Sequence, residues 1–260
     1  MTAITARQRW QRAYSDARYW PKGRTRDEVL RWGLFKFFGP AFGRAFSAPF
    51  DRNVSAAAVP WYLAGGAPAP IAVYQPKGAV SLAASYVNLV NPGTYDAALG
   101  TAPTFGAATG WTFNGSQYLK IASVNAGYSV IVRFSGAVAS GAYTVCGANL
   151  AGHTAFFHPN RTTVVRYAFG AGSTFDVTPA LVAGTLAMCG DSGYRNGIAD
   201  VSGMNPPNVS VSAQWYVGAR NENGSPAQYF TGSVQALAIW DTSTNHATWM
   251  PSVMAACALI

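Results

Sequence analysis

Three Asn-Gly dipeptides restrict more than any other feature how this chain can fold. Asn114-Gly115, Asn196-Gly197 and Asn223-Gly224 each stand between short stretches that read as strands. Asn-Gly readily takes positive φ at both central positions of a type I′ turn, and the twist of that turn matches two paired strands. No helical period separates the three pairs. They predict an antiparallel β-protein, with residues 111–121 as its leading hairpin.

Other stretches support this interpretation. Residues 128–134 and 163–169 alternate between apolar and polar positions, and residues 214–218 form a further short apolar run. Residues 233–240 are apolar on both faces, which predicts a strand that is covered on both sides. Pro251 is expected to begin a short C-terminal helix. About a dozen short strands with turns between them predict two packed sheets.

Charge is distributed unevenly along the 260 residues. Residues 1–52 carry eleven Lys or Arg and four Asp or Glu, whereas residues 53–260 carry seven and six. Such asymmetry is typical of a basic arm directed at nucleic acid, an acidic protein surface or anionic lipid. We therefore divide the chain into a basic, aromatic, helical anchoring arm (1–53), a spacer rich in Ala, Gly and Pro (54–72), and a β-domain (73–260).

Two helices are expected in the arm. Residues 5–20 fit a short helix that Pro21 ends, and the capping box at 25–28 begins a second helix that ends at Gly39-Pro40. A helix packed on its own domain and a basic helix lying on a membrane surface are the alternatives to docking on another subunit. For docking, the anchoring side chains are the arginines and large aromatics of the arm, namely Arg7, Arg9, Trp10, Arg12, Arg18, Trp20, Arg24, Arg26, Arg31, Trp32, Phe35 and Phe38.

The remaining sequence signals concern compartment. Cys146, Cys189 and Cys257 lie among apolar residues at no metal-ligand spacing, so we expect buried thiols. Arginines interrupt any apolar region of a signal peptide near the N-terminus. No stretch of about 18 apolar residues predicts a membrane span. A membrane is therefore not an expected partner. Nucleic acid is not expected either, because no nucleic-acid-binding fold is indicated and the Trp and Phe residues are spaced for packing.

Four motifs, taken in order, resemble the laminin-G-like, or concanavalin A-like, jelly-roll family. They are Trp111-Thr-Phe-Asn-Gly-Ser-Gln-Tyr-Leu, Tyr128-Ser-Val-Ile-Val-Arg-Phe, Gly190-Asp-Ser-Gly-Tyr-Arg-Asn-Gly, and the pair Tyr216-Val-Gly-Ala-Arg-Asn and Tyr229-Phe-Thr-Gly-Ser-Val-Gln-Ala-Leu-Ala-Ile-Trp. The resemblance covers roughly residues 75–257 and implies a sandwich of two antiparallel sheets behind the helical arm. The Ala/Gly-rich strands look like the versions found on bacteriophage virion proteins and bacterial surface proteins.

The family includes lectins, adhesion modules, glycoside hydrolases and structural appendages, so the fold alone does not choose among them. Its hydrolases carry Glu-x-Asp-x-Glu on one strand, because retaining hydrolysis needs two carboxyl groups about 5 Å apart. After Asp51 this chain has one glutamate and five scattered aspartates. The residues Gly190–Gly193 look like a serine-protease motif, but no histidine stands in a fitting context. We predict that the protein is not an enzyme and uses no cofactor.

Ligand sites are only weakly indicated. His153 and His158 would lie on opposite faces of a continuous strand, so no metal site is expected. A loop that sets an aromatic ring beside Asn or Asp is typical of lectins. On that ground the candidate glycan-binding residues are Asn221, Glu222, Asn223 and Tyr229.

Together these features predict a virion structural protein, either a capsid decoration or a fibre protein. Its arm is expected to dock on other virion subunits, and its jelly roll to face outward from the particle. It would be made in the host cytoplasm. The alternative is a lectin-like adhesion module of a bacterial or phage surface, with host-surface glycans as its partners.

Overall fold

The computed structural model describes residues 59–124, 128–139, 143–169, 174–204 and 212–260. Val59–Ile260 form one compact unit. The predicted helices of the arm and all of its proposed anchoring residues lie outside the described residues. In the part of the chain that is described, no helix has the length and apolarity needed to cross a membrane.

The unit consists almost entirely of strands. The first half contains η2 (Trp61–Gly66), β1 (Ala72–Tyr74), α3 (Leu82–Ser85), β2 (Ala98–Thr101), β3 (Thr104–Gly106), β4 (Gly110–Asn114), β5 (Tyr118–Val124), β6 (Ser129–Ser135) and β7 (Cys146–Leu150). The second half contains β8 (His153–Arg161), β9 (Val164–Phe169), β10 (Thr174–Val177), β11 (Gly184–Cys189), β12 (Ser192–Arg195), β13 (Ile198–Val201), β14 (Ala213–Val217), β15 (Arg220–Glu222), β16 (Ser225–Ala227), β17 (Thr231–Trp240) and α4 (His246–Cys257).

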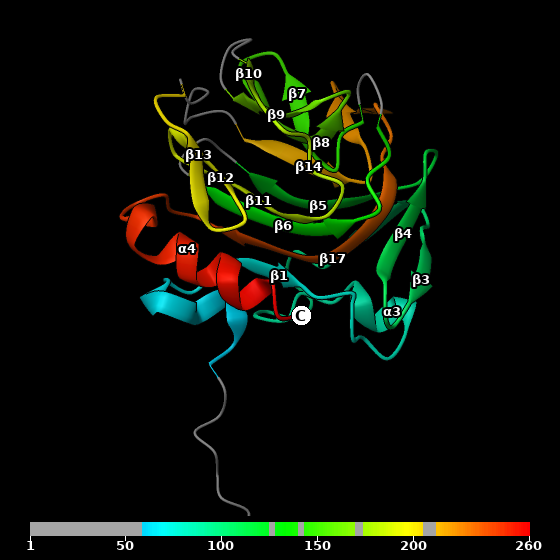
Figure 1. Ribbon diagram of the computed structural model, residues 1–260. Helices are drawn as coiled ribbons and strands as arrows, with labels where there is room; N and C mark the ends of the chain where they lie inside the picture. The colour runs from blue at the N-terminus through cyan, green and yellow to red at the C-terminus, as the bar shows by residue number, and fades with distance from the viewer. Residues whose placement is uncertain (1–58, 125–127, 140–142, 170–173, 205–211) are drawn as a thin grey trace, which may run out of the picture. The chain divides into compact units, whose positions relative to one another are not determined.

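These strands form two sheets that pack face to face, which confirms the predicted all-β jelly-roll sandwich (Figure 1). The eight-stranded sheet has the order β13-β12-β11-β6-β17-β4-β3, and β1 pairs with β17. The nine-stranded sheet has the order β10-β9-β8-β7-β14-β5-β2, and β15 and β16 join it beside β7. Among the pairs of named strands only β15 with β7 is parallel.

The main core lies between the two sheets. Alternate residues of each strand point into it, as the strand geometry requires. Val130, Val132 and Phe134 enter from β6, while Tyr167 and Trp215 enter from the opposite sheet. All these side chains are buried, so the alternation predicted for residues 128–134 and 163–169 is confirmed.

A second core lies outside the eight-stranded sheet. There α4 and η2 cover the sheet, and Trp240 of β17 packs against Trp249 of α4 with ring centroids 5.1 Å apart. Leu237 and Ile239 of the same strand face the main core. The prediction that β17 is covered on both sides is confirmed. The prediction that Pro251 begins the C-terminal helix is wrong, because α4 begins at His246 and contains the proline.

Two of the three Asn-Gly hairpins are confirmed. Asn196-Gly197 joins β12 to β13 with φ of 52° and 86°, and Asn223-Gly224 joins β15 to β16 with φ of 49° and 90°. The third prediction, that residues 111–121 form a hairpin, is wrong. There β4 pairs with β3 and β17, whereas β5 pairs with β2 and β14, so Asn114-Gly115 carries the chain from one sheet to the other.

The described part of the expected spacer is not a free linker. Trp61 is buried in the second core and donates a hydrogen bond to Gln75 (3.0 Å). The carbonyl oxygen of Pro68 accepts a hydrogen bond from the indole of Trp240 (2.9 Å), and Ala72 pairs with Ile239. Residues 59–72 belong to the sandwich because their few large side chains have an apolar face to cover.

Candidate functional site

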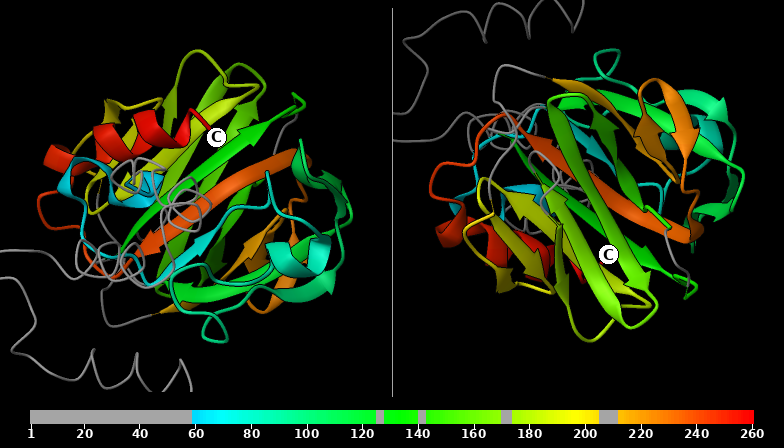
Figure 2. Two further views of the ribbon diagram at one scale, coloured as in Figure 1. Left: turned by 90° about the horizontal axis from the view of Figure 1, so that it is seen from below. Right: turned by 90° about the horizontal axis from the view of Figure 1, so that it is seen from above.

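The outer faces of the two sheets differ. The eight-stranded sheet is covered by α4 and η2, whereas no described helix lies over the nine-stranded sheet (Figures 1 and 2). We call the outer face of the nine-stranded sheet the open face. It carries Tyr118, Lys120, Asn149, Phe156, His158, Arg166, Asp176, Tyr216, Arg220, Glu222 and Tyr229. A jelly roll that binds a ligand with a sheet would use this uncovered surface.

Strand alternation places these side chains outward. On β8, Phe157 points into the main core, so its neighbours Phe156 and His158 point to the open face. On β9, Tyr167 points inward, and Arg166, which pairs with His158 across the strands, points outward. The open face is therefore a regular product of the sheet and not an accident of loop placement.

A tyrosine cluster occupies one part of the open face. The rings of Tyr118 and Tyr216 pack at a tilt of 37° with centroids 4.9 Å apart, and Tyr229 meets Tyr118 edge-on at 6.3 Å. Tyr118 and Tyr229 remain half-exposed, whereas Tyr216 is buried. The ammonium of Lys120 lies 6.0 Å from the Tyr216 ring. The ring of Tyr118 lies against Gly100 of β2, where a Cβ would approach its ring carbons to 2.2 Å.

The β15–β16 hairpin borders this cluster. The hydroxyl of Tyr216 donates to the carbonyl oxygen of Gly224 in the hairpin turn (2.9 Å). Glu222 accepts a hydrogen bond from the Asn149 amide (2.8 Å) and forms an ion pair with Arg220. The Arg220 guanidinium lies 4.8 Å from the ring centroid of Phe156. Charged, amide and aromatic groups thus stand side by side along one edge of the tyrosines.

His158 lies buried beside Phe156 on the same strand. It is 1% exposed, and its ring lies 4.7 Å from that of Phe156. Its Nε2 lies 2.9 Å from the Thr144 hydroxyl and 3.0 Å from Oε1 of Gln228. Because Oε1 can only accept, Nε2 carries a proton. Burial, together with the nearby Arg220 and Arg166 charges, lowers the pKa of His158 to about 4, although the Gln228 hydrogen bond opposes that shift.

At the far edge of the open face, Arg166 forms a two-bond ion pair with Asp176. The guanidinium lowers the pKa of the Asp176 carboxyl and the carboxylate raises the pKa of Arg166, so each holds the other charged. This pair gives the open face fixed hydrogen-bonding groups at its rim.

The four predicted glycan-binding residues have different places. Asn221 is 4% exposed, and its amide bonds the Gln214 carbonyl and the Gly224 amide, both at 2.7 Å, so it stabilises the hairpin. Asn223 is exposed at the turn. Glu222 and Tyr229 lie on the open face, Glu222 in the hairpin and Tyr229 beside Tyr118. Their role in binding stays a prediction.

Most of the open face was missed by the sequence reasoning. Tyr118 and Lys120 share one face of β5, and Phe156 and His158 share one face of β8. The alternation could have identified them, but only with the knowledge of which sheet remains uncovered.

The structure also places the two strand histidines. His153 faces the core, with Nε2 3.4 Å from the indole nitrogen of Trp215, whereas His158 lies on the open face. Their predicted placement on opposite faces is confirmed. Within the described ranges, no three His, Cys, Asp or Glu side chains lie close enough together to hold a metal ion. The residues Gly190–Gly193, which look like a protease motif, lie at the β11–β12 turn, and all three cysteines are buried free thiols.

Comparison with known proteins supports the fold. No protein-family model matches the sequence, and no curated protein matches it. The structure is similar to Trypanosoma rangeli sialidase bound to 2,3-difluorosialic acid (TM-score 0.51, 15% identity) and to the same enzyme with the inhibitor DANA (TM-score 0.50, 14% identity). These matches cover 74% and 73% of this chain but only 33% and 34% of the sialidase chains. It is also similar to domain 4 of AbnA, a GH43 extracellular arabinanase from Geobacillus stearothermophilus, with arabinotriose (TM-score 0.49, 17% identity, 71% of this chain and 95% of that one).

The comparison corrects one prediction. We predicted from the missing Glu-x-Asp-x-Glu pattern that the protein is not an enzyme, and this is contradicted by the similarity to sialidases, which are enzymes. The missing pattern argues against one type of hydrolase and not against enzymes in general. At these identities the similarity establishes a lectin-like β-sandwich fold.

Proposed function

We propose that the protein is a glycan-binding module that contacts carbohydrate with the open face of its nine-stranded sheet. The observation that carries the proposal is the tyrosine cluster, in which half-exposed Tyr118 contacts both half-exposed Tyr229 and buried Tyr216. The C–H face of a sugar ring is apolar and packs on aromatic rings, which supply large contact area at a low cost in side-chain entropy.

The groups beside the cluster suit the sugar hydroxyls. Glu222 supplies acceptors, Lys120 and Arg220 supply donors, and Asn149 supplies both within the hairpin network. An apolar platform with a few polar groups held in position is the usual construction of a small-molecule site. The sialidase with a similar fold binds 2,3-difluorosialic acid, a carbohydrate derivative, which is consistent with this proposal.

Binding of the full chain to an array of neutral and acidic oligosaccharides tests the proposal. Tyr118→Ala and Tyr229→Ala should each weaken binding of the strongest ligand about tenfold, as expected from losing roughly 1.4 kcal/mol of stacking. Tyr95→Ala removes an exposed ring that lies outside the cluster and should bind like the unchanged protein. No binding by the full chain, or equal binding by all three variants, would exclude the proposal.

We also propose that residues 1–53 anchor this module to other subunits of a virion. The uneven charge supports an anchoring role, since the first 52 residues carry eleven basic and four acidic side chains. The virion itself is proposed from the resemblance of the Ala/Gly-rich strands to jelly rolls of bacteriophage particles. Host-surface glycans would then be the ligands of the displayed open face.

A further inference from the structure

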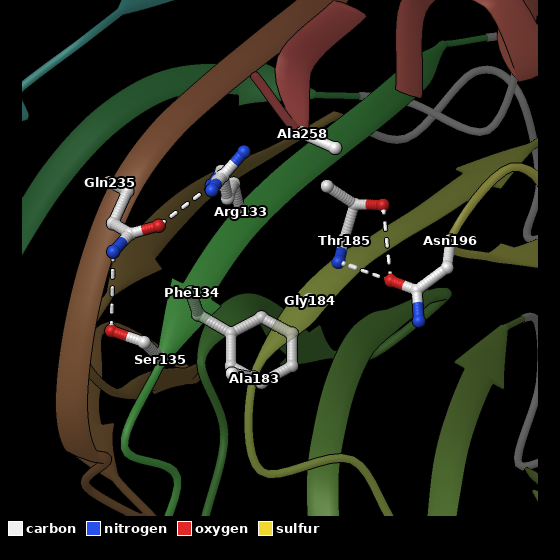
Figure 3. Close-up of a pocket in the computed structure, with 9 residues that line it drawn as sticks. All are labelled: Arg133, Phe134, Ser135, Ala183, Gly184, Thr185, Asn196, Gln235 and Ala258. Carbon is white, nitrogen blue, oxygen red and sulfur yellow. Dashed lines mark hydrogen bonds between the residues drawn. The ribbon is translucent and has the colours of Figure 1, made fainter. Parts of the chain in front are cut away.

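A second candidate site lies on the other side of the sandwich. A cavity of about 300 Å³ opens on the outer face of the eight-stranded sheet, where α4 ends (Figure 3). Its polar lining comes from four separate elements: Arg133 and Ser135 of β6, Thr185 of β11, Asn196 of the β12–β13 turn, and Gln235 of β17. We call it the Arg133 cavity.

Hydrogen bonds fix the orientation of both carboxamides in the Arg133 cavity. Oε1 of Gln235 accepts from Nε of Arg133 (2.7 Å), and Nε2 of Gln235 donates to the Ser135 hydroxyl (3.3 Å). Oδ1 of Asn196 accepts from the backbone N–H of Thr185 (2.9 Å). Both amide oxygens are therefore used, while the NH₂ group of Asn196 and one hydrogen of the Gln235 NH₂ group remain as donors. Figure 3 shows that both bonds drawn to Asn196 end on its amide oxygen, one from the Thr185 N–H and one from the Thr185 hydroxyl.

Arg133 adds a fixed positive charge. Its Nη1 donates to the carbonyl oxygen of Cys257 at the end of α4 and its Nε donates to Gln235, but it forms no ion pair with a described residue. None of the nine residues that line the cavity is Asp or Glu. A guanidinium is always charged and matches a planar carboxylate well.

We propose that the Arg133 cavity binds the carboxylate of a small acidic ligand of about monosaccharide size, such as a sugar acid. The groups left available are the remaining N–H donors of Arg133, Asn196 and Gln235 together with the Ser135 hydroxyl, because the Thr185 hydroxyl donates to Oδ1 of Asn196 (3.5 Å). The ligand therefore has to supply acceptors. The volume lies at the small end of ligand sites in proteins. This site is separate from the proposed glycan face, because the two lie on opposite outer faces of the sandwich.

Isothermal titration of the full chain tests the inference with three probes: D-glucuronate, D-glucose and inorganic phosphate. D-glucose differs from glucuronate in lacking the carboxylate, and it should not bind at the concentrations at which glucuronate does. Phosphate distinguishes a carboxylate site from a general anion site. Binding of phosphate alone, equal binding of glucose, or binding of no probe would overturn the inference.

Two variants locate the binding. Asn196→Asp keeps the oxygen that accepts from Thr185 and tolerates positive φ, but it replaces a donor by a negative charge. Gln235→Glu likewise keeps the acceptor for Arg133. Each should weaken glucuronate binding about tenfold or more, since a repelled or unpaired charge costs more than a lost neutral hydrogen bond.

The matched control is Asn114→Asp. It adds the same charge to another Asn-Gly turn and keeps the oxygen that accepts from the Ser116 amide (3.1 Å). It should bind glucuronate like the unchanged protein. If Asn196→Asp and Gln235→Glu retain full affinity while their melting temperatures are unchanged, the carboxylate does not bind in the Arg133 cavity.

Discussion

At the scale of single residues, the protonation state of His158 is important for the stability of the open face. A neutral imidazole satisfies Gln228 and Thr144 at one nitrogen, while Nδ1 is buried without a hydrogen-bond partner in the described structure. A proton added at Nδ1 would place a charge beside Arg220 and Arg166, in a site that has little water to solvate it. The native state therefore requires the neutral ring.

This requirement predicts a loss of stability in acid. The unfolded chain binds a proton at a pKa of about 6.5 and the native chain at about 4, so the free energy of unfolding falls as the pH drops through that window. The His158 contribution to the loss should be about 2–3 kcal/mol between pH 7 and pH 4.5. Urea unfolding at both values, on the unchanged protein and on His158→Gln, measures it.

The variant His158→Gln cannot take up this proton, so its stability should depend less on pH by that amount. His246→Gln, at the start of α4, is the control and should keep the full loss because it retains His158. Equal pH dependence in His158→Gln and the unchanged protein would show that the ring does not control acid stability.

At the scale of elements, α4 closes the outer face of the eight-stranded sheet. Trp249 is 3% exposed and packs on Trp240, so Trp249→Ala leaves a cavity in the second core. The free energy of unfolding should fall by about 3–5 kcal/mol. Denaturant unfolding measures this, and Ala255→Ser on the exposed side of the same helix should change it by less than about 0.5 kcal/mol. A small effect of Trp249→Ala would mean that α4 does not contribute to the core.

The elements also show where sequence reasoning succeeds. Local signals predicted the strands and the Asn196-Gly197 and Asn223-Gly224 hairpins, because positive φ in a two-residue turn is a local requirement. The Asn114-Gly115 turn was misread, because its strands differ in their distant partners and not in their own pattern. The open face was missed for the same reason. Which outward-facing side chains remain uncovered depends on where α4 packs, more than a hundred residues along the chain from Tyr118.

At the scale of the whole molecule, the boundary between arm and sandwich lies earlier than composition indicates. Residues 59–72 are short of large side chains and look like a linker, yet Trp61 is 8% exposed in the second core and Ala72 is fully buried in the sheet. The compact unit accordingly begins at Val59. The burial of Trp61 and the pairing of Ala72 with Ile239 make residues 59–72 part of the sandwich, although their Ala, Gly and Pro content is typical of a linker.

Two truncations separate anchoring from folding. Removal of residues 1–58 leaves every described core side chain in place, so we expect the melting temperature to stay within about 2 °C of the full chain, as when less than 1 kcal/mol is lost. Removal of residues 1–72 also deletes Trp61 and the Pro68 carbonyl that binds Trp240. It should lower the melting temperature by several degrees, since burying a tryptophan contributes about 3 kcal/mol or more.

Both truncations should lose incorporation into particles if the arm is the anchor. Incorporation of the 59–260 protein at the level of the full chain would place the docking surface on the sandwich, and equal melting temperatures for the two truncations would show that residues 59–72 are a linker after all.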